Sequence, residues 1–221
     1  MKTTVKICGL SSPDHVDAAI KAGADMVGFV FFDASPRNVT CDAAAALAEH
    51  ARGRAQIVAL SVDAENDALA AIVAALRPDI LQFHGRETPD RIAAIGTEFG
   101  VPCMKAIGVA EASDLARIGE YRSVCDRVLL DAKAPKDANR PGGLGAAFDW
   151  TILTDFNPGL AWMLSGGLDA GNVGAALAAT GAPGVDVSSG VESAPGVKDA
   201  GMIEAFVAAV RAHDAGEAAA A

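Results

Sequence analysis

The sequence predicts an α/β fold of alternating strands and helices, and two features of the chain indicate it. Short apolar runs recur along the whole chain, separated by segments with apolar residues at helical spacing. The connections between them are short, and strictly alternating βα units give parallel strands with right-handed crossovers. About eight such units in 221 residues predict a single parallel eight-stranded (β/α)8 TIM barrel over residues 1–221.

A doubly wound open sheet is the alternative, because it shares this alternation of strands and helices. That fold normally places a glycine-rich phosphate loop after its first strand, whereas here the glycine turns follow the seventh and eighth predicted strands. No break in composition marks a domain boundary. The alanine-rich tail at 214–221 either extends the last helix or frays.

The predicted strands are short and mostly apolar. Residues 26–32 form a nearly continuous apolar run, as expected for a strand covered on both faces. In the first strand, alternation places Val5 and Ile7 on one face and Lys6 and Cys8 on the other. The strands are expected at residues 4–8, 26–32, 56–61, 80–83, 102–106, 127–130, 161–164 and 184–187.

Two of the helices begin at clear N-terminal signals. Ser12 and Thr88 are good N-cap residues, and each precedes a proline suited to the first helical position. Gly23 is expected to end the first helix. A glycine-rich loop is expected at 132–147. The helices are expected near 13–23, 41–50, 69–76, 89–99, 111–121, from 148 onward, and at 172–179 and 199–213.

Composition and charge narrow the class of protein. The formal net charge of -10 argues against nucleic acid or an anionic membrane as the main partner. The four cysteines show no CxxC or Cys/His pairing, so no zinc site is expected, and three of them are interpreted as packing residues: Cys41, Cys103 and Cys125. With no signal-peptide pattern and no long apolar run, we expect a soluble cytoplasmic protein with reduced thiols.

Glycine and serine follow the last two predicted strands. Gly166 and Gly167 come after the seventh strand, and Ser188, Ser189 and Gly190 come after the eighth. Successive backbone N–H groups at such turns converge on an anion, and barrels of this class often bind phosphate at this position. Ordinary βα turns are the alternative. We expect a phosphate site formed by these five residues.

Cys8 and Asp131 end the first and sixth predicted strands, on either side of that phosphate site. The arrangement would hold a phosphorylated sugar between an acid and a base. To act as base, Cys8 has to be more acidic than a free thiol, and Lys6 bears on that. The alternatives are a small buried hydrophobe for Cys8 and a loop-capping carboxylate for Asp131.

Three further side chains are expected to point into the barrel. Lys6 and Asp186 come from adjacent strands, so we expect them to form an ion pair that is either architectural or catalytic. His84, near the end of the fourth strand, is interpreted as a structural hydrogen-bonding residue rather than a catalyst.

In this order, several segments together resemble the phosphoribosylanthranilate isomerase family of tryptophan biosynthesis, over nearly the whole chain to about Val210. The segments are Val5-Lys6-Ile7-Cys8-Gly9-Leu10, Gly28-Phe29-Val30-Phe31, Ser35-Pro36-Arg37, Leu81-Gln82-Phe83-His84-Gly85, Leu130-Asp131, Gly142-Gly143-Leu144-Gly145, Phe148-Asp149-Trp150, Leu164-Ser165-Gly166-Gly167-Leu168, and Gly184-Val185-Asp186-Val187-Ser188-Ser189-Gly190-Val191-Glu192.

The resemblance implies an aldose–ketose isomerase that catalyses an Amadori rearrangement of N-(5-phosphoribosyl)anthranilate. Asp131 matches the general acid that opens the furanose ring, and Cys8 matches the general base that takes the C2 proton. Arg37 would orient the anthranilate carboxylate, and Asp186 is placed with the substrate-binding residues. No metal or organic cofactor is implied, since two proton transfers suffice.

Two other readings remain open at this point. One is a related phosphate-binding barrel that acts on another phosphosugar, such as an epimerase; the other is a non-catalytic phosphosugar-binding barrel. Epimerases usually need paired acidic residues or metal-ligating histidines at strand ends, which the sequence does not show. For partners, we expect only the small-molecule substrate, and a monomer or a weak homodimer.

Overall fold

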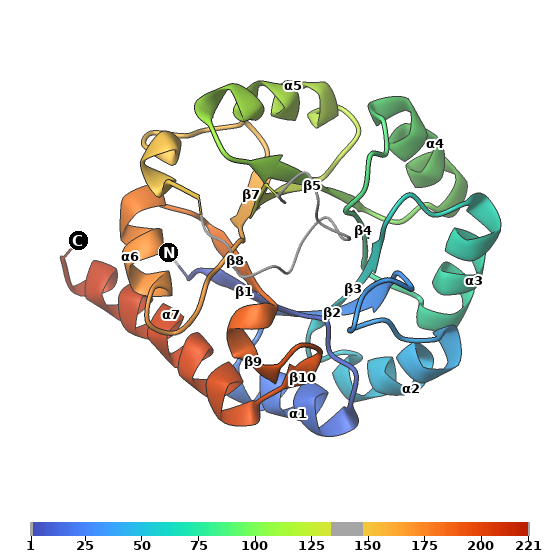
Figure 1. The fold of residues 1–221 in the computed structure, drawn as a ribbon, viewed down its shortest axis with the longest axis horizontal. Coiled ribbons are helices and arrows are strands. Elements are labelled where there is room, and N and C mark those ends of the chain that lie inside the picture. The colour runs from blue at the N-terminus through green and yellow to red at the C-terminus, as the bar shows by residue number, and fades with distance from the viewer. Residues whose placement is uncertain (1, 134–147, 221) are drawn as a thin grey trace.

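The computed structural model of the chain describes residues 2–133 and 148–220. Its eight parallel strands pair in sequence order, and β8 pairs with β1 to close the barrel (Figure 1). The predicted (β/α)8 barrel is therefore confirmed, and the open-sheet alternative is wrong. The strands are β1 (Thr4–Cys8), β2 (Met26–Phe31), β3 (Gln56–Ser61), β4 (Ile80–Phe83), β5 (Cys103–Val109), β6 (Arg127–Ala132), β7 (Ala161–Leu164) and β8 (Gly184–Val187).

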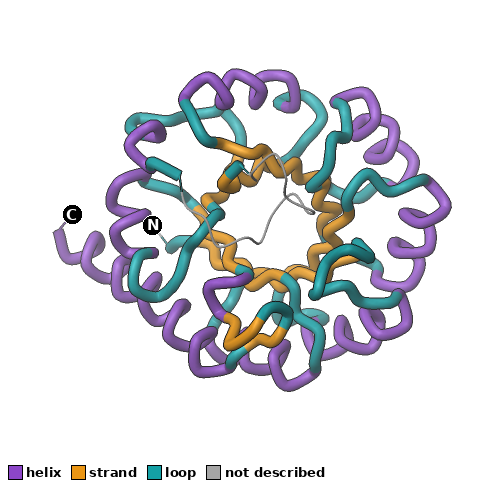
Figure 2. The backbone as a smooth tube through the Cα atoms, viewed as in Figure 1, coloured by secondary structure: helices purple, strands orange, loops and turns teal. Residues whose placement is uncertain are grey.

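The helices form a ring around the barrel (Figure 2). Ser12 and Thr88 cap α1 and α4 as predicted, because each side-chain oxygen accepts a hydrogen bond from the N–H three residues on. Gly23 ends α1 with φ +95°. The helices are α1 (Pro13–Ala22), α2 (Cys41–Ala51), α3 (Asn66–Leu76), α4 (Pro89–Phe99), α5 (Ile118–Tyr121), α6 (Val173–Thr180) and α7 (Ala200–Ala220).

The main departure from the predicted elements lies at 111–121. Instead of one helix, the chain forms the 3-10 helix η1 (Ala112–Arg117) followed by the single turn of α5. Gly119 lies within this segment, and glycine disfavours a helix interior by about 1 kcal/mol relative to alanine. β5 also runs three residues past its predicted end at 106, because Val109 still pairs with Ala132 of β6.

Two segments after β6 also differ from the prediction. A 3-10 helix, η2 (Trp150–Leu153), stands where the helix from 148 was expected. The helix predicted at 199–213 continues to Ala220 as α7, so the backbone of the alanine-rich tail extends the helix. Most of the predicted glycine-rich loop, including 142–145, lies outside the described residues.

After β8 the chain forms a small hairpin that the sequence did not predict. The 3-10 helix η3 (Ser189–Val191) leads into β9 (Glu192–Ala194), which pairs antiparallel with β10 (Val197–Lys198). Gly196, at φ +82°, forms the turn and lies against the backbone of Pro36. The hairpin therefore places Glu192 and Lys198 beside the loop that follows β2.

The core has two apolar layers. One lies between the strands and the surrounding helices, and the other fills the lower part of the barrel with Met26, Val58, Ile80, Met104, Leu129 and Met163. Toward the carboxyl ends of the strands, the inward positions become polar: Lys6, Gln82, Asp131 and Asp186 are all buried there. In barrels of this class, that end carries the ligand site.

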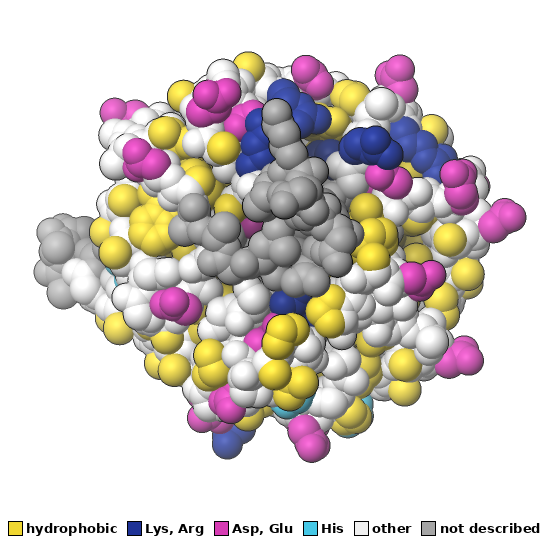
Figure 3. Space-filling model, viewed as in Figure 1, with side chains coloured by type: hydrophobic (Ala, Val, Ile, Leu, Met, Phe, Trp, Pro, Cys, Tyr) yellow, Lys and Arg dark blue, Asp and Glu magenta, His cyan; other side chains and the backbone are white. Residues whose placement is uncertain are grey.

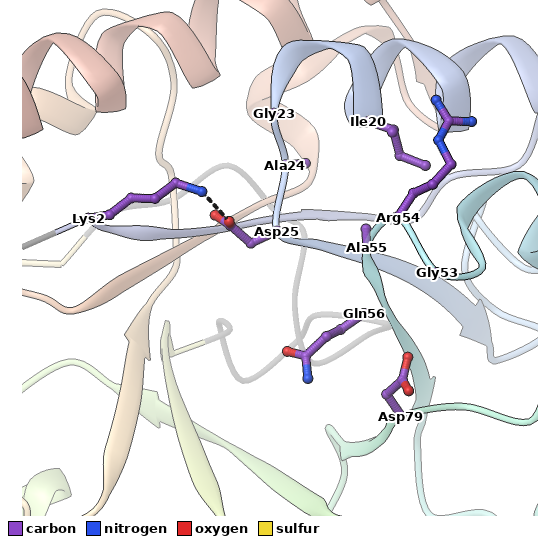
Figure 4. Close-up of a pocket in the computed structure, with 10 residues that line it drawn as sticks. All are labelled: Lys2, Ile20, Gly23, Ala24, Asp25, Gly53, Arg54, Ala55, Gln56 and Asp79. Atoms are coloured by element: carbon purple, nitrogen blue, oxygen red, sulfur yellow. Dashed lines mark hydrogen bonds and ion pairs between the residues drawn. The ribbon is translucent and has the colours of Figure 1, made fainter.

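A hollow of about 540 Å³ lies at the opposite end, beside the start of β2, β3 and β4 (Figure 4). Its charged groups are already engaged. Lys2 binds Asp25 at 2.6 Å, Arg211 binds the same carboxylate at 2.9 Å, and Asp79 accepts the Ile57 N–H at 2.7 Å. The hollow therefore reflects the packing of the amino-terminal end and contains none of the predicted site residues.

The expected ion pair inside the barrel is present. Lys6 Nζ lies 2.8 Å from Asp186 Oδ1, on directly paired residues of β1 and β8. The lysine side chain is fully buried and that of Asp186 is 6% exposed. Burial opposes the charge on Lys6, but Asp186 and Cys8 outweigh it and raise the pKa of the lysine above its usual value.

Removing one member of this pair is predicted to destabilise the protein strongly. Lys6→Met leaves the Asp186 carboxylate buried without its counter-ion, which typically costs about 3–5 kcal/mol. The matched control is Lys2→Met, because Lys2 pairs with Asp25 at the surface, where a lost ion pair costs about 1 kcal/mol or less. Urea unfolding of both variants measures the difference. Equal losses in the two would contradict the burial argument.

Candidate active site

Cys8 is the last residue of β1 and faces the barrel interior, where it is 4% exposed. Gly28 is its paired residue on β2, and a Cβ at that position would lie 3.0 Å from the Cys8 Sγ. The glycine therefore leaves room for the thiol between the two strands. The alternation read from the sequence placed Lys6 and Cys8 on one face, and the structure confirms it.

The thiol of Cys8 is less acidic than a free thiol, even though Lys6 acts to lower its pKa. Burial raises the pKa of the thiol and is the largest effect, with Asp186 acting in the same direction. Lys6 and Lys198 pull the pKa down, as expected, but the net result lies above the ordinary value. Lys6 therefore acts on the thiol in the expected direction, but burial, reinforced by the charge of Asp186, outweighs it.

Asp131 lies near the end of β6 with both carboxyl oxygens engaged. Oδ1 accepts the backbone N–H of Ala132 at 2.9 Å, and Oδ2 lies 3.2 Å from His84 Nε2. The other ring nitrogen of His84, Nδ1, lies 3.4 Å from Gln82 Nε2. His84 was expected to be a structural hydrogen-bonding residue, and its partner is the proposed catalytic acid.

A second buried ion pair fixes the segment that follows His84. Lys105, on β5, donates to the carbonyl oxygen of Gly85 at 2.7 Å and to Glu87 Oε2 at 2.9 Å. Glu87 Oε1 in turn accepts the N–H of Asp63 at 2.8 Å. The chain after β4 is therefore tied to β5 and to the loop after β3.

The glycine and serine turns lie between Cys8 and Asp131. Gly166 has φ +89°, and a Cβ there would lie 2.5 Å from the Ala132 nitrogen and 3.1 Å from Asp131 Oδ1. Gly167, at φ +63°, follows it. On the other side, Ser188 Oγ donates to the carbonyl oxygen of Cys8 at 3.1 Å. The turn after β7 thus contacts Asp131, and the turn after β8 contacts Cys8.

The other residues expected here lie between and beside these two turns. Asp186 Oδ1 is taken by Lys6, and its Oδ2 lies 3.5 Å from Ser165 Oγ. The carboxylate therefore links β1, β7 and β8 beneath the turns. Ser189 and Gly190 form the start of η3, where a Cβ on Gly190 would collide with the carbonyl oxygen of Leu168, 1.9 Å away.

Arg37 is held by residues that sequence reasoning did not identify as site residues. Its Nε and Nη2 donate to the two carboxylate oxygens of Glu192 at 2.6 and 2.7 Å. Lys198 binds the same carboxylate at 2.7 Å and also the Ser188 carbonyl oxygen at 2.8 Å. Arg37 also packs on Gly9, at φ +78°, where a Cβ would lie 2.5 Å from the arginine Cδ.

These contacts shift the acidity of the paired groups. Burial alone would raise the pKa of Glu192, but its hydrogen bonds and charges from Arg37 and Lys198 outweigh burial and lower it. Burial dominates for Lys198 and lowers its pKa despite Glu192. Glu192 therefore stays ionised and fixes both cations.

Within residues 2–133 and 148–220, no three His, Cys, Asp or Glu side chains are grouped so that they could hold a metal ion. No described helix is long and apolar enough to cross a membrane. Looking along the barrel axis, Lys and Arg side chains gather on the α4 and α5 side, while most acidic side chains lie nearer the edge (Figure 3).

Known proteins match this chain over nearly its full length. It is 59% identical over 214 residues to an N-(5'-phosphoribosyl)anthranilate isomerase of Nitrobacter hamburgensis, covering 97% of this chain and 95% of that protein. It is 58% identical over 214 residues to the enzyme of the same name from Rhodopseudomonas palustris strain BisA53, covering 97% of this chain and 98% of that protein.

Solved structures agree with these sequence matches. The phosphoribosyl anthranilate isomerase of Thermotoga maritima superposes with a TM-score of 0.86 at 31% identity, covering 95% of this chain and 99% of that one. A phosphoribosyl anthranilate isomerase in complex with reduced 1-(o-carboxyphenylamino)-1-deoxyribulose 5-phosphate superposes with a TM-score of 0.83 at 28% identity, with the same coverage. The family model of N-(5'-phosphoribosyl)anthranilate isomerase matches residues 5–209. The chain therefore belongs to the N-(5'-phosphoribosyl)anthranilate isomerase family.

Proposed function

We propose that this isomerase acts on N-(5'-phosphoribosyl)anthranilate with Cys8 as general base and Asp131 as general acid. The observation that carries the proposal is their placement at the ends of β1 and β6, with the turns after β7 and β8 between them. The Ser188 hydroxyl lies 3.1 Å from the carbonyl oxygen of Cys8, and Gly166 lies beside the carboxyl group of Asp131. A sugar phosphate anchored at these turns would have its reacting carbons between the thiol and the carboxyl group.

The chemistry requires only proton transfers. Asp131 gives a proton to the ring oxygen as the bond from that oxygen to C1 breaks, which leaves a Schiff base between C1 and the anthranilate nitrogen. The Cys8 thiolate then removes the proton from C2. The resulting enol loses its hydroxyl proton and gains one at C1, giving 1-(2-carboxyphenylamino)-1-deoxyribulose 5-phosphate with no net change in atoms. Each positioned acid or base typically contributes about 10²–10⁴-fold to the rate.

The phosphate is assigned to the turns after β7 and β8. Gly166 and Gly167 both have positive φ, which turns successive N–H groups in a way that L side chains rarely allow. The facing turn supplies the hydroxyl of Ser189 and the backbone N–H groups of Ser188, Ser189 and Gly190, whereas the Ser188 hydroxyl is already donated to the carbonyl oxygen of Cys8. Backbone donors of this kind bind phosphate without a basic surface, which fits the net charge of -10.

Arg37 is assigned to the anthranilate carboxylate. Among residues 2–133 and 148–220, Glu192 is the hydrogen-bond acceptor for the guanidinium and uses one N–H at Nε and one at Nη2, which leaves three of the five N–H donors for a ligand. The pairing with Glu192 and the packing on Gly9 hold the guanidinium in one orientation. Asp186, whose oxygens face Lys6 and Ser165, is kept with the substrate-binding residues, beneath the two turns.

The exposed apolar side chains and the thiols bear on the oligomeric state and on the cellular compartment. We infer a monomer or weak homodimer, because Val197 and Met202 are the exposed large hydrophobic residues in the described part of the chain, too few for an extensive apolar interface. The four thiols are all unpaired, which fits a reducing compartment such as the cytoplasm.

Substitution of either acid–base residue is predicted to abolish most turnover. Cys8→Ala and Asp131→Asn are each expected to lower kcat by about 10²–10⁴-fold with the fold intact. The measurement is the change in anthranilate fluorescence with freshly made phosphoribosylanthranilate, alongside circular dichroism. Cys41→Ala, a thiol on α2, is the control and should keep parental turnover. Near-normal kcat in Cys8→Ala would refute the assignment of the base.

A negative charge in the phosphate site is predicted to weaken substrate binding. Ser189→Asp is expected to raise KM, and the inhibition constant of inorganic phosphate, about tenfold or more, because like charges brought together cost several kcal/mol. Ser193→Asp, on the exposed strand β9, adds the same charge outside the site and should change neither constant. If both variants behave alike, the phosphate lies elsewhere.

A further inference from the structure

Gln82, His84 and Asp131 form a line of hydrogen-bonding groups that the proposed chemistry does not yet use. Gln82 Nε2 lies 3.4 Å from His84 Nδ1, and His84 Nε2 lies 3.2 Å from Asp131 Oδ2. Gln82 is fully buried on β4, and its Oε1 has no hydrogen-bond partner among the described residues. A buried polar atom left unpaired costs about 1–3 kcal/mol, so its retention calls for a reason.

The orientation of the Gln82 amide fixes where the imidazole carries its proton. A neutral imidazole has one donor nitrogen and one acceptor nitrogen. When the amide presents its NH₂ group, as here, Nδ1 must accept, and the ring proton lies on Nε2. That N–H then donates to Asp131 Oδ2. This arrangement suits the carboxylate form of Asp131, which can only accept.

The other tautomer of His84, with its ring proton on Nδ1, suits the protonated form of Asp131. Oδ1 already accepts the Ala132 N–H, so a proton on Asp131 is best placed on Oδ2, where it donates to His84 Nε2. Nδ1 then carries the ring proton and needs an acceptor. A half-turn of the Gln82 amide supplies one, because it exchanges Nε2 for Oε1, the atom that otherwise lacks a partner. The two ends of an amide have nearly the same shape, so the surrounding packing is kept.

We propose that Gln82 and His84 form a two-state relay that matches the hydrogen bond at Asp131 Oδ2 to the protonation of that carboxyl group. In the first state the amide NH₂ faces Nδ1 and Nε2–H faces a carboxylate. In the second, the amide oxygen faces Nδ1–H and Nε2 accepts from a carboxylic acid. Passing from the first to the second takes up one proton from water, and in net terms the ring proton moves from Nε2 to Nδ1.

The relay deepens the proposed function and rests on it, because it matters only if Asp131 is the acid. During each turnover the proton on Oδ2 leaves its hydrogen bond with His84 Nε2 and passes to the ring oxygen of the substrate, and Asp131 then has to regain one. With the relay, Oδ2 keeps a partner of the right kind in both forms, and the carboxyl plane stays fixed between His84 and the Ala132 N–H. Gln82 and His84 are therefore positioning residues, and their loss should lower kcat rather than raise KM.

The first experiment uses ¹⁵N NMR to determine which ring nitrogen of His84 carries the proton. In protein carrying ¹⁵N-labelled histidine, with the His84 signals identified from a His84→Asn variant, the ligand-free parent is expected to carry its ring proton on Nε2. The carboxyl group in Gln82→Glu offers only acceptors to Nδ1 when it is ionised, so at a pH that ionises it the ring in that variant is expected to carry a proton on Nδ1. An unchanged ring protonation pattern in Gln82→Glu would overturn the relay, whatever the activity of the variant.

The second experiment tests the effect on turnover. Gln82→Met keeps the volume without the amide and is expected to lower kcat about 10-fold to 100-fold, as misplacement of a catalytic group does, with KM within about twofold. Met104→Leu is the matched control, because Met104 is the paired residue of Gln82 on β5 and is equally buried without a hydrogen bond. Parental kcat in Gln82→Met would also overturn the relay.

A pair of His84 variants separates positioning from general damage to the fold. His84→Gln can place an amide N–H near the former Nε2 and should recover part of the kcat that His84→Leu loses. Equal kcat in the two would contradict the relay. If instead the assignment of Asp131 as the general acid is wrong, the Asp131→Asn variant will keep a near-parental kcat. If Asp131→Asn is inactive while the Gln82 variants keep parental kcat and ring protonation, the relay alone is wrong.

Discussion

The ion pair between Lys6 and Asp186 is the interaction on which the rest of the site depends. It joins β1 to β8, the two strands whose pairing closes the barrel, and it does so inside the barrel, one layer below the proposed phosphate turns. Asp186 also reaches toward Ser165, the residue that follows β7. One buried carboxylate thereby sets the relative positions of the strands that carry Cys8 and both phosphate-binding turns. A buried pair is costly to form and costlier to break, which favours a single arrangement.

The same pair has a chemical consequence for Cys8. Lys6 lowers the pKa of the thiol, but burial is the larger effect and the charge of Asp186 adds to it, so the pKa of Cys8 is raised. A thiol in this state is protected from indiscriminate reaction in the ligand-free protein. The architecture thus ties the reactivity of the base to the balance of charges inside the barrel.

On either side of this ion pair, two side-chain networks orient polar groups at the carboxyl end of the barrel. Glu192 and Lys198, carried by the hairpin after β8, hold Arg37 and the Ser188 carbonyl. Gln82 and His84, on β4 and just after it, hold Asp131. Each network reaches across several strands of the barrel, so the ligand end is pre-organised by contacts between elements far apart in the sequence. Pre-organisation of this kind keeps catalytic groups aligned without the cost of ordering them during the reaction.

The sequence by itself determined the barrel, most element bounds and the inward direction of Cys8, Lys6 and Asp186, because βα alternation and period-two strands are local patterns. The same period, followed back from the inward His84, could also have indicated that Gln82 shares the interior with it. Only the tertiary structure decided that Asp131 meets His84 and that Glu192 meets Arg37, 155 residues away, since no local pattern encodes which distant side chains become neighbours. It also decided the pKa of Cys8, because burial and the sharing of Lys6 with Asp186 arise only when the barrel closes.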